Sequence, residues 1–214
     1  MRISLLCSDE QHPINDYLHR WISKRKNIDQ IELVRKKSEL SGGDILFLIS
    51  CSEIVNAIDR SAYRASLVLH ASDLPQGRGW SPHIWQIIEG AEEIALSLLE
   101  AEDKVDSGRI WKKKRFSVPK HALWDEINES LFSAEIELIE FAVQEFSSVY
   151  PVEQDASIEP TYYPRRSPAE SQIDPKQSIA SQFDKIRVCD PHRFPAFFEL
   201  HGKKYKIVLE KVND

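Results

Sequence analysis

The chain has 214 residues, of which 42% are hydrophobic and 29% are charged, and its formal net charge is −6. This composition is typical of a globular protein with a buried core, and the acidic balance argues against a large nucleic-acid footprint. No apolar run approaches the roughly 20 residues of a membrane helix, and residues 1–7 do not resemble a signal peptide. The three cysteines are far apart and lack the spacing of metal ligands, which favours a reduced cytoplasm and no metal site.

The first part of the chain alternates strands and a helix. Residues 2–7 and 31–34 predict strands, and the continuous apolar run over 44–50 predicts a strand buried on both faces. Pro13 suits the first turn of a helix, whose apolar residues recur at helical spacing on one face. No Gly-x-Gly-x-x-Gly follows the first strand. We therefore expect a Rossmann-like, mainly parallel α/β sheet without the usual pyrophosphate-binding loop.

The stretch 66–108 organises the rest of the chain. Its expected elements are a strand (67–69), a loop (71–82), a helix (83–89), a strand (94–99) and a turn (102–108). His70 follows the first strand, and Asp106 lies in the turn. In a parallel sheet both loops would leave the carboxyl ends of their strands, where such sheets bind ligands. We therefore expect His70 and Asp106 to face one crevice.

Residues 109–147 predict an edge strand and a long helix. The strand over 109–116 carries four consecutive basic residues, 112–115. The simpler interpretation is a solvated edge that resists strand pairing, and the alternative is an anion contact. The helix over 122–147 has one apolar face. Its acidic residues are expected on the solvated face: Asp125, Glu126, Glu129, Glu135, Glu137 and Glu140.

The remaining residues predict an extension of the main domain. Five of the 11 prolines lie between 151 and 175 and indicate an extended strap. Its tyrosines and arginines either contact a base and phosphates or pin the strap to the core. A helix around Phe183 and a β-hairpin over 197–212 follow. We predict a catalytic domain over 1–150 and an extension over 151–214, whose hairpin could pair with its mate in a homodimer.

A family resemblance lies in the central stretch. The segment "LHASDLPQGRGWSP", with "VDSG" further on, resembles the formyltetrahydrofolate-dependent formyltransferases, whose core reads Asn-x-His-x-Ser-x-Leu-Pro-x-x-Arg-Gly and then Leu-Asp-x-Gly. His70 and Asp106 are 36 positions apart, which is the spacing expected for the family's His and Asp. Gly-Trp-Ser-Pro and "TYYPRRSP" are most similar to short sugar-nucleotide formyltransferases of the pseudaminic acid pathway type. One position departs, because Val68 stands where the family has Asn.

The resemblance implies an activity and a set of site residues. It implies transfer of a formyl group from N10-formyltetrahydrofolate to the amino group of a nucleotide-linked amino sugar, foremost a UDP-4-amino-4,6-dideoxy sugar. His70 and Asp106 would be catalytic, since a histidine moves protons near neutral pH and a carboxylate supports it. The expected cofactor residues are Ser72, Asp73, Leu74 and Pro75. The expected substrate residues are His12, Arg78, Trp80, Tyr163 and Arg165. The basic edge strand would then be a possible contact for the folate's glutamate tail.

Two other functions remain open at this stage. One is formylation of an aminoacyl group on tRNA or a carrier protein, although tRNA binding should bring a basic face and a larger C-terminal domain. The other is a folate-binding protein without transfer activity, suggested by Val68. Because valine has no side-chain donor, another group must face the oxyanion of the reaction. We expect protonated His70, with the Ser50 or Ser52 hydroxyl or a backbone N–H as alternatives.

Overall fold

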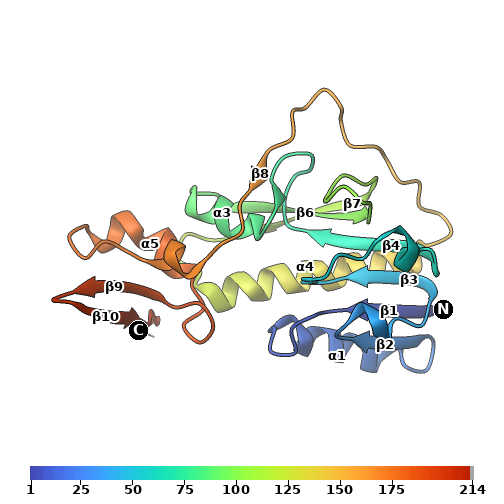
Figure 1. Cartoon of the computed structure of the whole chain (residues 1–214), viewed down its shortest axis with the longest axis horizontal. Coiled ribbons are helices and arrows are strands. Elements are labelled where there is room, and N and C mark those ends of the chain that lie inside the picture. The colour runs from blue at the N-terminus through green and yellow to red at the C-terminus, as the bar shows by residue number, and fades with distance from the viewer. Residues whose placement is uncertain (213–214) are drawn as a thin grey trace.

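The computed structural model describes residues 1–212 and builds an α/β core with a C-terminal extension (Figure 1). In chain order the elements are β1 (Arg2–Leu6), α1 (Ile14–Arg25), β2 (Gln30–Val34), η1 (Lys37–Glu39), β3 (Gly43–Leu48), α2 (Ala57–Arg60), β4 (Tyr63–His70), β5 (Arg78–Gly79), α3 (Pro82–Ile88), β6 (Glu93–Glu100), β7 (Ile110–Ser117), α4 (Trp124–Gln144), β8 (Tyr162–Tyr163), η2 (Pro168–Ser171), α5 (Ile179–Arg187), β9 (Ala196–Leu200) and β10 (Lys203–Ile207). The short elements η1, η2, α2, β5 and β8 have no counterpart in the sequence prediction.

The central sheet has six strands in the order β2-β1-β3-β4-β6-β7. The pairs β1–β2, β1–β3 and β3–β4 are parallel, which confirms the predicted Rossmann-like, mainly parallel fold. Leu5 and Phe47 on one face of its central strands, and Leu6 and Leu46 on the other face, are fully buried. Burial on both faces explains why these strands are continuous apolar runs rather than alternating ones.

The orientation of β6 differs from the prediction. It pairs with β4 in the antiparallel sense, with His70 opposite Ser97 and Leu67 opposite Glu100. The last residue of β6, Glu100, therefore lies opposite Leu67, three residues before His70. At the rise of a strand, the loop after β6 starts about 10 Å from His70 along β4. The expectation that both loops leave the carboxyl ends of parallel strands is wrong. The loop must instead turn back along the sheet to bring Asp106 to His70.

Helix α4 packs against β6, β7 and α1, and Figure 1 shows it running behind the sheet along the length of the core. Its Glu140 accepts hydrogen bonds from Trp21 Nε1 at 2.8 Å and from Arg25 at 2.6 Å. The face of α4 that carries Leu131 and Leu138 is buried. Glu135 lies four residues after Leu131 and three before Leu138, so it falls on this face. It is only 9% exposed, and its expected place on the solvated face is wrong.

Helix α5 and the hairpin of the extension lie at one end of the molecule, and the strap before them runs across the top of Figure 1 to reach that end. Arg187 of α5 is 1% exposed and donates to the carbonyl oxygens of Pro119 and Ala122. The hairpin of β9 and β10 ends at Ile207 rather than at 212. The division into two domains and the pairing of hairpins in a homodimer stay predictions.

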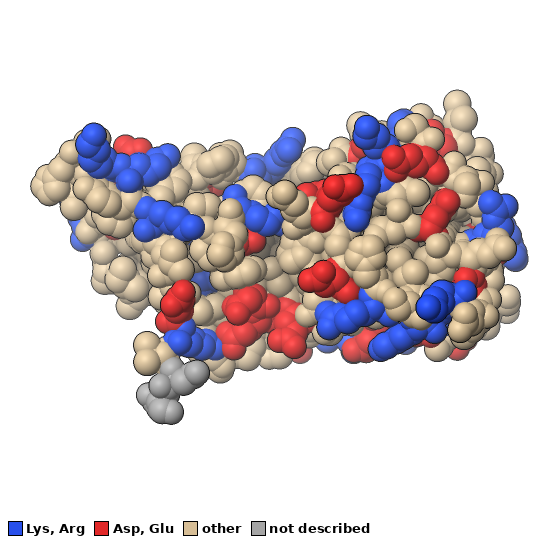
Figure 2. Space-filling view, turned by 90° about the horizontal axis from the view of Figure 1, so that it is seen from below, with Lys and Arg blue, Asp and Glu red and all other residues tan. Residues whose placement is uncertain are grey.

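The surface carries charges of both signs. Figure 2, a view from below, shows Lys and Arg interspersed with Asp and Glu across this face, without a large area of one sign. No helix in residues 1–212 is long and apolar enough to cross a membrane.

Candidate active site

His70 ends β4 and is 6% exposed, with both ring nitrogens engaged by other residues of the described chain. Nε2 lies 2.8 Å from the carbonyl oxygen of Gly77, and Nδ1 lies 3.5 Å from Asp106 Oδ1. A carbonyl and an ionised carboxylate only accept hydrogen bonds. Nε2 therefore carries hydrogen towards Gly77 O, and Nδ1 faces the Asp106 carboxylate at ion-pair distance. The structure thus brings together the two residues that the motif singles out.

Asp106 is held in place by backbone and side-chain contacts. Its φ is 55°, a left-handed conformation that Asp tolerates better than most residues. Its Oδ2 accepts from the backbone N–H of Gly79 at 2.9 Å, so one carboxylate links the histidine ring to the loop after β4. The next turn needs Gly108, because a Cβ there would collide with the carbonyl oxygen of Glu100. The side chain of Asp106 is 6% exposed.

The strap supplies two residues that the sequence analysis missed. Gln154 Nε2 donates to the carbonyl oxygens of Asp106 at 2.8 Å and Gly108 at 2.9 Å, and its Oε1 accepts from Arg78 at 2.6 Å. Thr161 Oγ1 accepts from the N–H of Gly77 at 2.8 Å. Isolated polar residues in a proline-rich segment carry no periodic signal, so only the folded contacts reveal them. Together they fasten the loops that hold the His70–Asp106 pair.

The predicted substrate residues of the loop and the strap have different surroundings. Arg78 is 5% exposed and bonds Gln154, while its Nε is buried without a hydrogen-bond partner among the described residues. Tyr163 donates to Glu89 at 2.7 Å and stacks on Trp85 at 6.3 Å, which favours its role as a pin for the strap.

Trp80 and Arg165 form an exposed pair near that strap. The Arg165 guanidinium lies 4.8 Å from the centre of the Trp80 ring, and Trp80 is 45% exposed. The short strands β5 and β8 pair in parallel, with Gly79 opposite Tyr163. This pairing holds the strap beside the loop after His70, so the exposed pair lies at the edge of the site.

The predicted cofactor residues do not share one environment. Ser72 is 1% exposed, and its Oγ has no hydrogen-bond partner among the described residues. Asp73 is exposed and forms salt bridges with Lys113 at 2.5 Å and Arg115 at 3.0 Å. These contacts employ two of the four basic residues of β7 within the chain. A free anion contact there would have to compete with Asp73.

A cavity of about 410 Å³ lies between the loop, β7 and the strap. Its lining includes Asp73, Leu74, Lys113 and Gln154. His70 and Asp106 are not part of the lining. The cavity therefore adjoins half of the predicted cofactor residues but not the catalytic pair.

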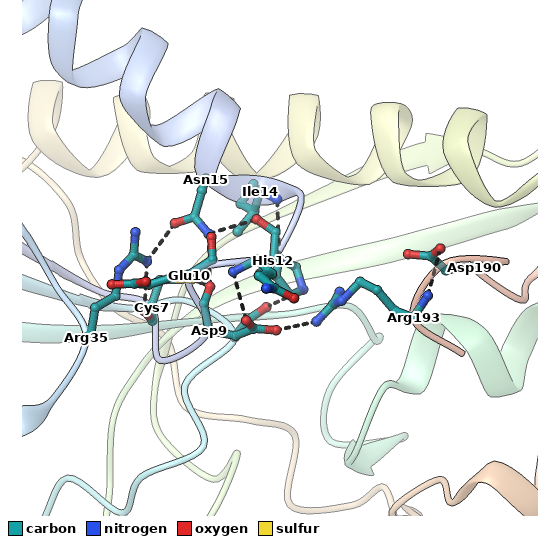
Figure 3. Close-up of polar contacts among 11 residues, drawn as sticks. Cys7, Asp9, Glu10, His12, Ile14, Asn15, Arg35, Asp190 and Arg193 are labelled. Atoms are coloured by element: carbon teal, nitrogen blue, oxygen red, sulfur yellow. Dashed lines mark hydrogen bonds and ion pairs between the residues drawn. The ribbon is translucent and has the colours of Figure 1, made fainter. Parts of the chain in front are cut away.

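His12 lies in the loop between β1 and α1, which Figure 3 shows as a network of polar contacts. Its Nδ1 accepts from the N–H of Ile14 at 3.3 Å, and its Nε2 lies 3.1 Å from Ser50 Oγ. Burial, and then the positive charge of Arg193, lower the pKa of His12 to about 4. The ring is therefore neutral at pH 7.

The same loop is braced from both sides (Figure 3). Asn15 Nδ2 donates to the carbonyl oxygens of Asp9, Glu10 and His12 at 2.8–3.1 Å. Arg35 in turn donates to Asn15 Oδ1 at 2.7 Å. From the extension, Arg193 forms an ion pair with Asp9.

His83 of α3 belongs to the same neighbourhood. Its pKa is lowered to about 3, first by burial and then by the charges of His12 and His70. All three rings are therefore close enough to interact electrostatically. No cluster of His, Cys, Asp or Glu within residues 1–212 has the arrangement of a metal site.

The sequence of the chain is similar to those of known proteins. No family model matches the chain. The methionyl-tRNA formyltransferase of Rickettsia typhi is 29% identical over 188 residues, which are 87% of this chain and 60% of that protein. The chain thus spans about 60% of the length of the curated relatives that it matches.

Solved structures share the whole fold. A methionyl-tRNA formyltransferase from Clostridium thermocellum has a TM-score of 0.81 at 20% identity, over 97% of each chain. A sugar N-formyltransferase from Shewanella sp. FDAARGOS_354 has a TM-score of 0.74 at 15% identity, over 100% of this chain and 99% of that chain. HypX from Aquifex aeolicus in complex with tetrahydrofolic acid has a TM-score of 0.76 at 20% identity, over 95% of this chain and 36% of that chain. The comparisons confirm the fold and support a relationship to the formyltransferase family.

Proposed function

We propose that this protein transfers the formyl group of N10-formyltetrahydrofolate to the amino group of a nucleotide-linked amino sugar. The observation that carries the proposal is the buried His70–Asp106 pair at the end of β4, with a separation of 3.5 Å between Nδ1 and Oδ1. The relationship to formyltransferases supports the reaction class, and the tetrahydrofolic acid bound by HypX supports the donor class.

The two residues divide the proton transfers of the reaction. The bound donor supplies a formyl carbon attached to nitrogen. The acceptor amine must attack as the neutral base, and the Asp106 carboxylate, fixed by the N–H of Gly79, accepts the proton that the amine loses. His70, when protonated, supplies the proton that the departing nitrogen requires. Fixing both groups before the substrates bind avoids reorganisation during the reaction.

The loop after His70 fits a folate-derived donor in part. Ser72 Oγ is a buried polar atom without a partner in the described chain, and an unpaired buried polar atom is costly unless a ligand or water satisfies it. Ser72 is therefore assigned to the donor, with buried Leu74 as an apolar neighbour. Asp73 is assigned a structural role, because β7 already neutralises its carboxylate.

The acceptor class rests on charge and on the exposed pair of Trp80 and Arg165. The net charge is −6, and the face in Figure 2 has interspersed charges rather than a basic area, which disfavours a polyanionic tRNA. An aromatic ring beside a guanidinium suits a nucleotide base and its phosphates. We assign this pair to the nucleotide. The acceptor sugar would then extend from there towards Asp106.

Methionyl-tRNA is the second candidate acceptor, because the curated relatives carry that name. Chain length does not decide between the two, since the fold matches 97% of the resolved Clostridium thermocellum chain. The net charge and the mixed surface favour the sugar nucleotide.

The test is incubation of the protein with N10-formyltetrahydrofolate and one acceptor at a time, read by mass spectrometry. The acceptors are UDP- and dTDP-linked 4-amino sugars, and charged initiator methionyl-tRNA. Asp106→Asn, which keeps the shape but not the basicity, is the matched control. Formylated sugar nucleotide is the expected product. Formylation of methionyl-tRNA alone would overturn the acceptor class, and no formylation of any acceptor would overturn the proposed reaction.

A further inference from the structure

In acyl transfer, the carbonyl oxygen of the transferred group gains negative charge as the amine attacks. A hydrogen-bond donor is needed to stabilise that oxygen. Val68, two residues before His70, has no side-chain donor. His70 itself is the donor expected from the sequence, but its Nε2 contacts Gly77 O, its Nδ1 faces Asp106, and the proposed function already uses its proton for the departing nitrogen. A third group is therefore needed, and it should lie beside the end of β4.

The register of β3 and β4 points to Ser50. Leu48, the last residue of β3, is paired with Val68 of β4 in a parallel register, and this register, continued two residues past the end of β3, brings Ser50 level with His70. Ser50 is exposed and has a φ of 46°. Serine seldom adopts this left-handed conformation, which costs free energy and is often retained at functional sites.

His12 determines where the Ser50 hydroxyl hydrogen points. The N–H of Ile14 donates to His12 Nδ1, so Nδ1 must be the unprotonated nitrogen. A neutral ring then carries its hydrogen on Nε2, 3.1 Å from Ser50 Oγ. That hydrogen can only be donated to the hydroxyl oxygen. The O–H of Ser50 is thus left free, and no acceptor within residues 1–212 takes it.

The opposite direction of the hydrogen bond between Ser50 and His12 does not fit these contacts. If Ser50 donated to Nε2, a neutral His12 would carry hydrogen on Nδ1, facing the N–H of Ile14. A doubly protonated ring has the same conflict. The pKa of His12, lowered to about 4, agrees with the neutral form.

The orienting ring is itself rigid. Its loop is held by three hydrogen bonds from Asn15 and by the ion pair between Asp9 and Arg193 (Figure 3). The Phe132 ring, 5.7 Å away, packs against the imidazole. His83 interacts electrostatically with both His12 and His70, which is consistent with one shared crevice.

We propose that Ser50, oriented by His12, donates the hydrogen bond that stabilises the oxyanion during formyl transfer and so does what a side chain at Val68 cannot. Ser50 is a catalytic residue in this proposal, and His12 is a positioning residue. The proposal rests on the proposed function.

The first test removes the hydroxyl without straining the backbone. Ser50→Gly suits a φ of 46° and should lower kcat about 10²–10³-fold with little change in KM for either substrate. Ser50→Asn keeps a donor in a residue that tolerates this conformation, and it should retain at least a tenth of the wild-type kcat. Ser81 is exposed with the same φ of 46°, so Ser81→Gly controls for the backbone change and should stay within about twofold of wild type.

The second test asks whether Ser50 and residue 68 serve the same oxygen. In the Ser50→Gly background, Val68→Asn should restore kcat at least tenfold, whereas the same change in the wild type should give little gain. A loss below tenfold for Ser50→Gly, or no recovery in the double variant, would overturn the proposal while formyl transfer itself stands. If the wild type transfers no formyl group, both proposals fall.

A measurement on the free protein tests the role of His12 without catalysis. Nitrogen NMR of the His12 ring should show hydrogen on Nε2 and a neutral ring between pH 6 and 8, consistent with the pKa of about 4. Hydrogen on Nδ1 would reverse the polarity of the Ser50 contact and overturn the proposal. His12→Ala should then lower kcat less than Ser50→Gly, because it releases the hydroxyl rather than removing it.

Discussion

Glu135 is a buried acid in α4 whose replacement should change how the stability of the protein depends on pH. It is 9% exposed, and no salt bridge or side-chain hydrogen bond joins it to another residue of the described chain. Burial raises its pKa from 4.5 to about 8. Cys7 lies near enough to feel the charge of an ionised Glu135: the pKa of its thiol is raised, mainly by burial and to a smaller extent by Glu135. The carboxyl is thus neutral in the folded protein at pH 7.

The sign follows from proton binding in the two states. Between pH 4.5 and about 8, the folded state holds the Glu135 proton and the unfolded state releases it, so the free energy of unfolding falls as pH rises. At 1.36 kcal/mol per pH unit, the loss reaches roughly 4 kcal/mol at pH 8 and is below about 1 kcal/mol at pH 5. Glu135→Gln removes the titrating group and keeps the size of the side chain.

The assay is thermal unfolding of both proteins from pH 5 to pH 8. The variant should melt close to wild type at pH 5 and roughly 8–16 °C above it at pH 8, at 2–4 °C per kcal/mol for a chain of this size. Exposed Glu129 of the same helix, changed to Gln, is the matched control and should give parallel curves. Wild-type and Glu135→Gln curves that stay parallel across the range would refute a neutral, buried Glu135.

Other predictions concern the site. His70→Ala and Asp106→Ala should each abolish most turnover, and the double variant should be scarcely worse than the worse single one, because residues that act as a unit lose activity non-additively; additive losses would argue against a shared proton path. Gln154→Ala should lower kcat about tenfold and change its pH profile by releasing the Asp106 loop, whereas exposed Gln177→Ala should do neither. Gly79→Ala should weaken both activity and stability, since its Cβ would collide with the strap. A folate donor at about 100 times its Kd should stabilise the fold by roughly 2.7 kcal/mol, and an unchanged melting temperature would exclude the donor.

Local patterns were sufficient for much of the architecture. The apolar run of β3 and the helical spacing of α1 determine their type because burial on a sheet or a helix face imposes a fixed period. The motif from His70 to Gly79 and the later Asp106 gave the candidate catalytic pair, since their types and spacing are contained in the sequence itself. The edge position of β7 was likewise evident from its basic residues.

Other features depended on contacts between distant residues. The period of β6 is the same whether it pairs parallel or antiparallel, so its antiparallel pairing with β4 could not be read from its residues. Gln154 lies 48 positions from Asp106, and a hydrogen bond across such a separation leaves no local pattern. Glu135 lies four residues after Leu131 and three before Leu138, which is the spacing of the buried face of α4; only its charged type predicted a solvated position.

The sequence by itself therefore determined the main strands and helices, the mainly parallel sheet and the candidate His70–Asp106 pair. Only the tertiary structure decided how Asp106 reaches His70, which strap residues hold it, and which way the Ser50 hydroxyl points. The physical reason is that periodicity and motif spacing act along the chain. Strand direction, burial of a single acid and hydrogen-bond polarity are instead determined where separate segments meet.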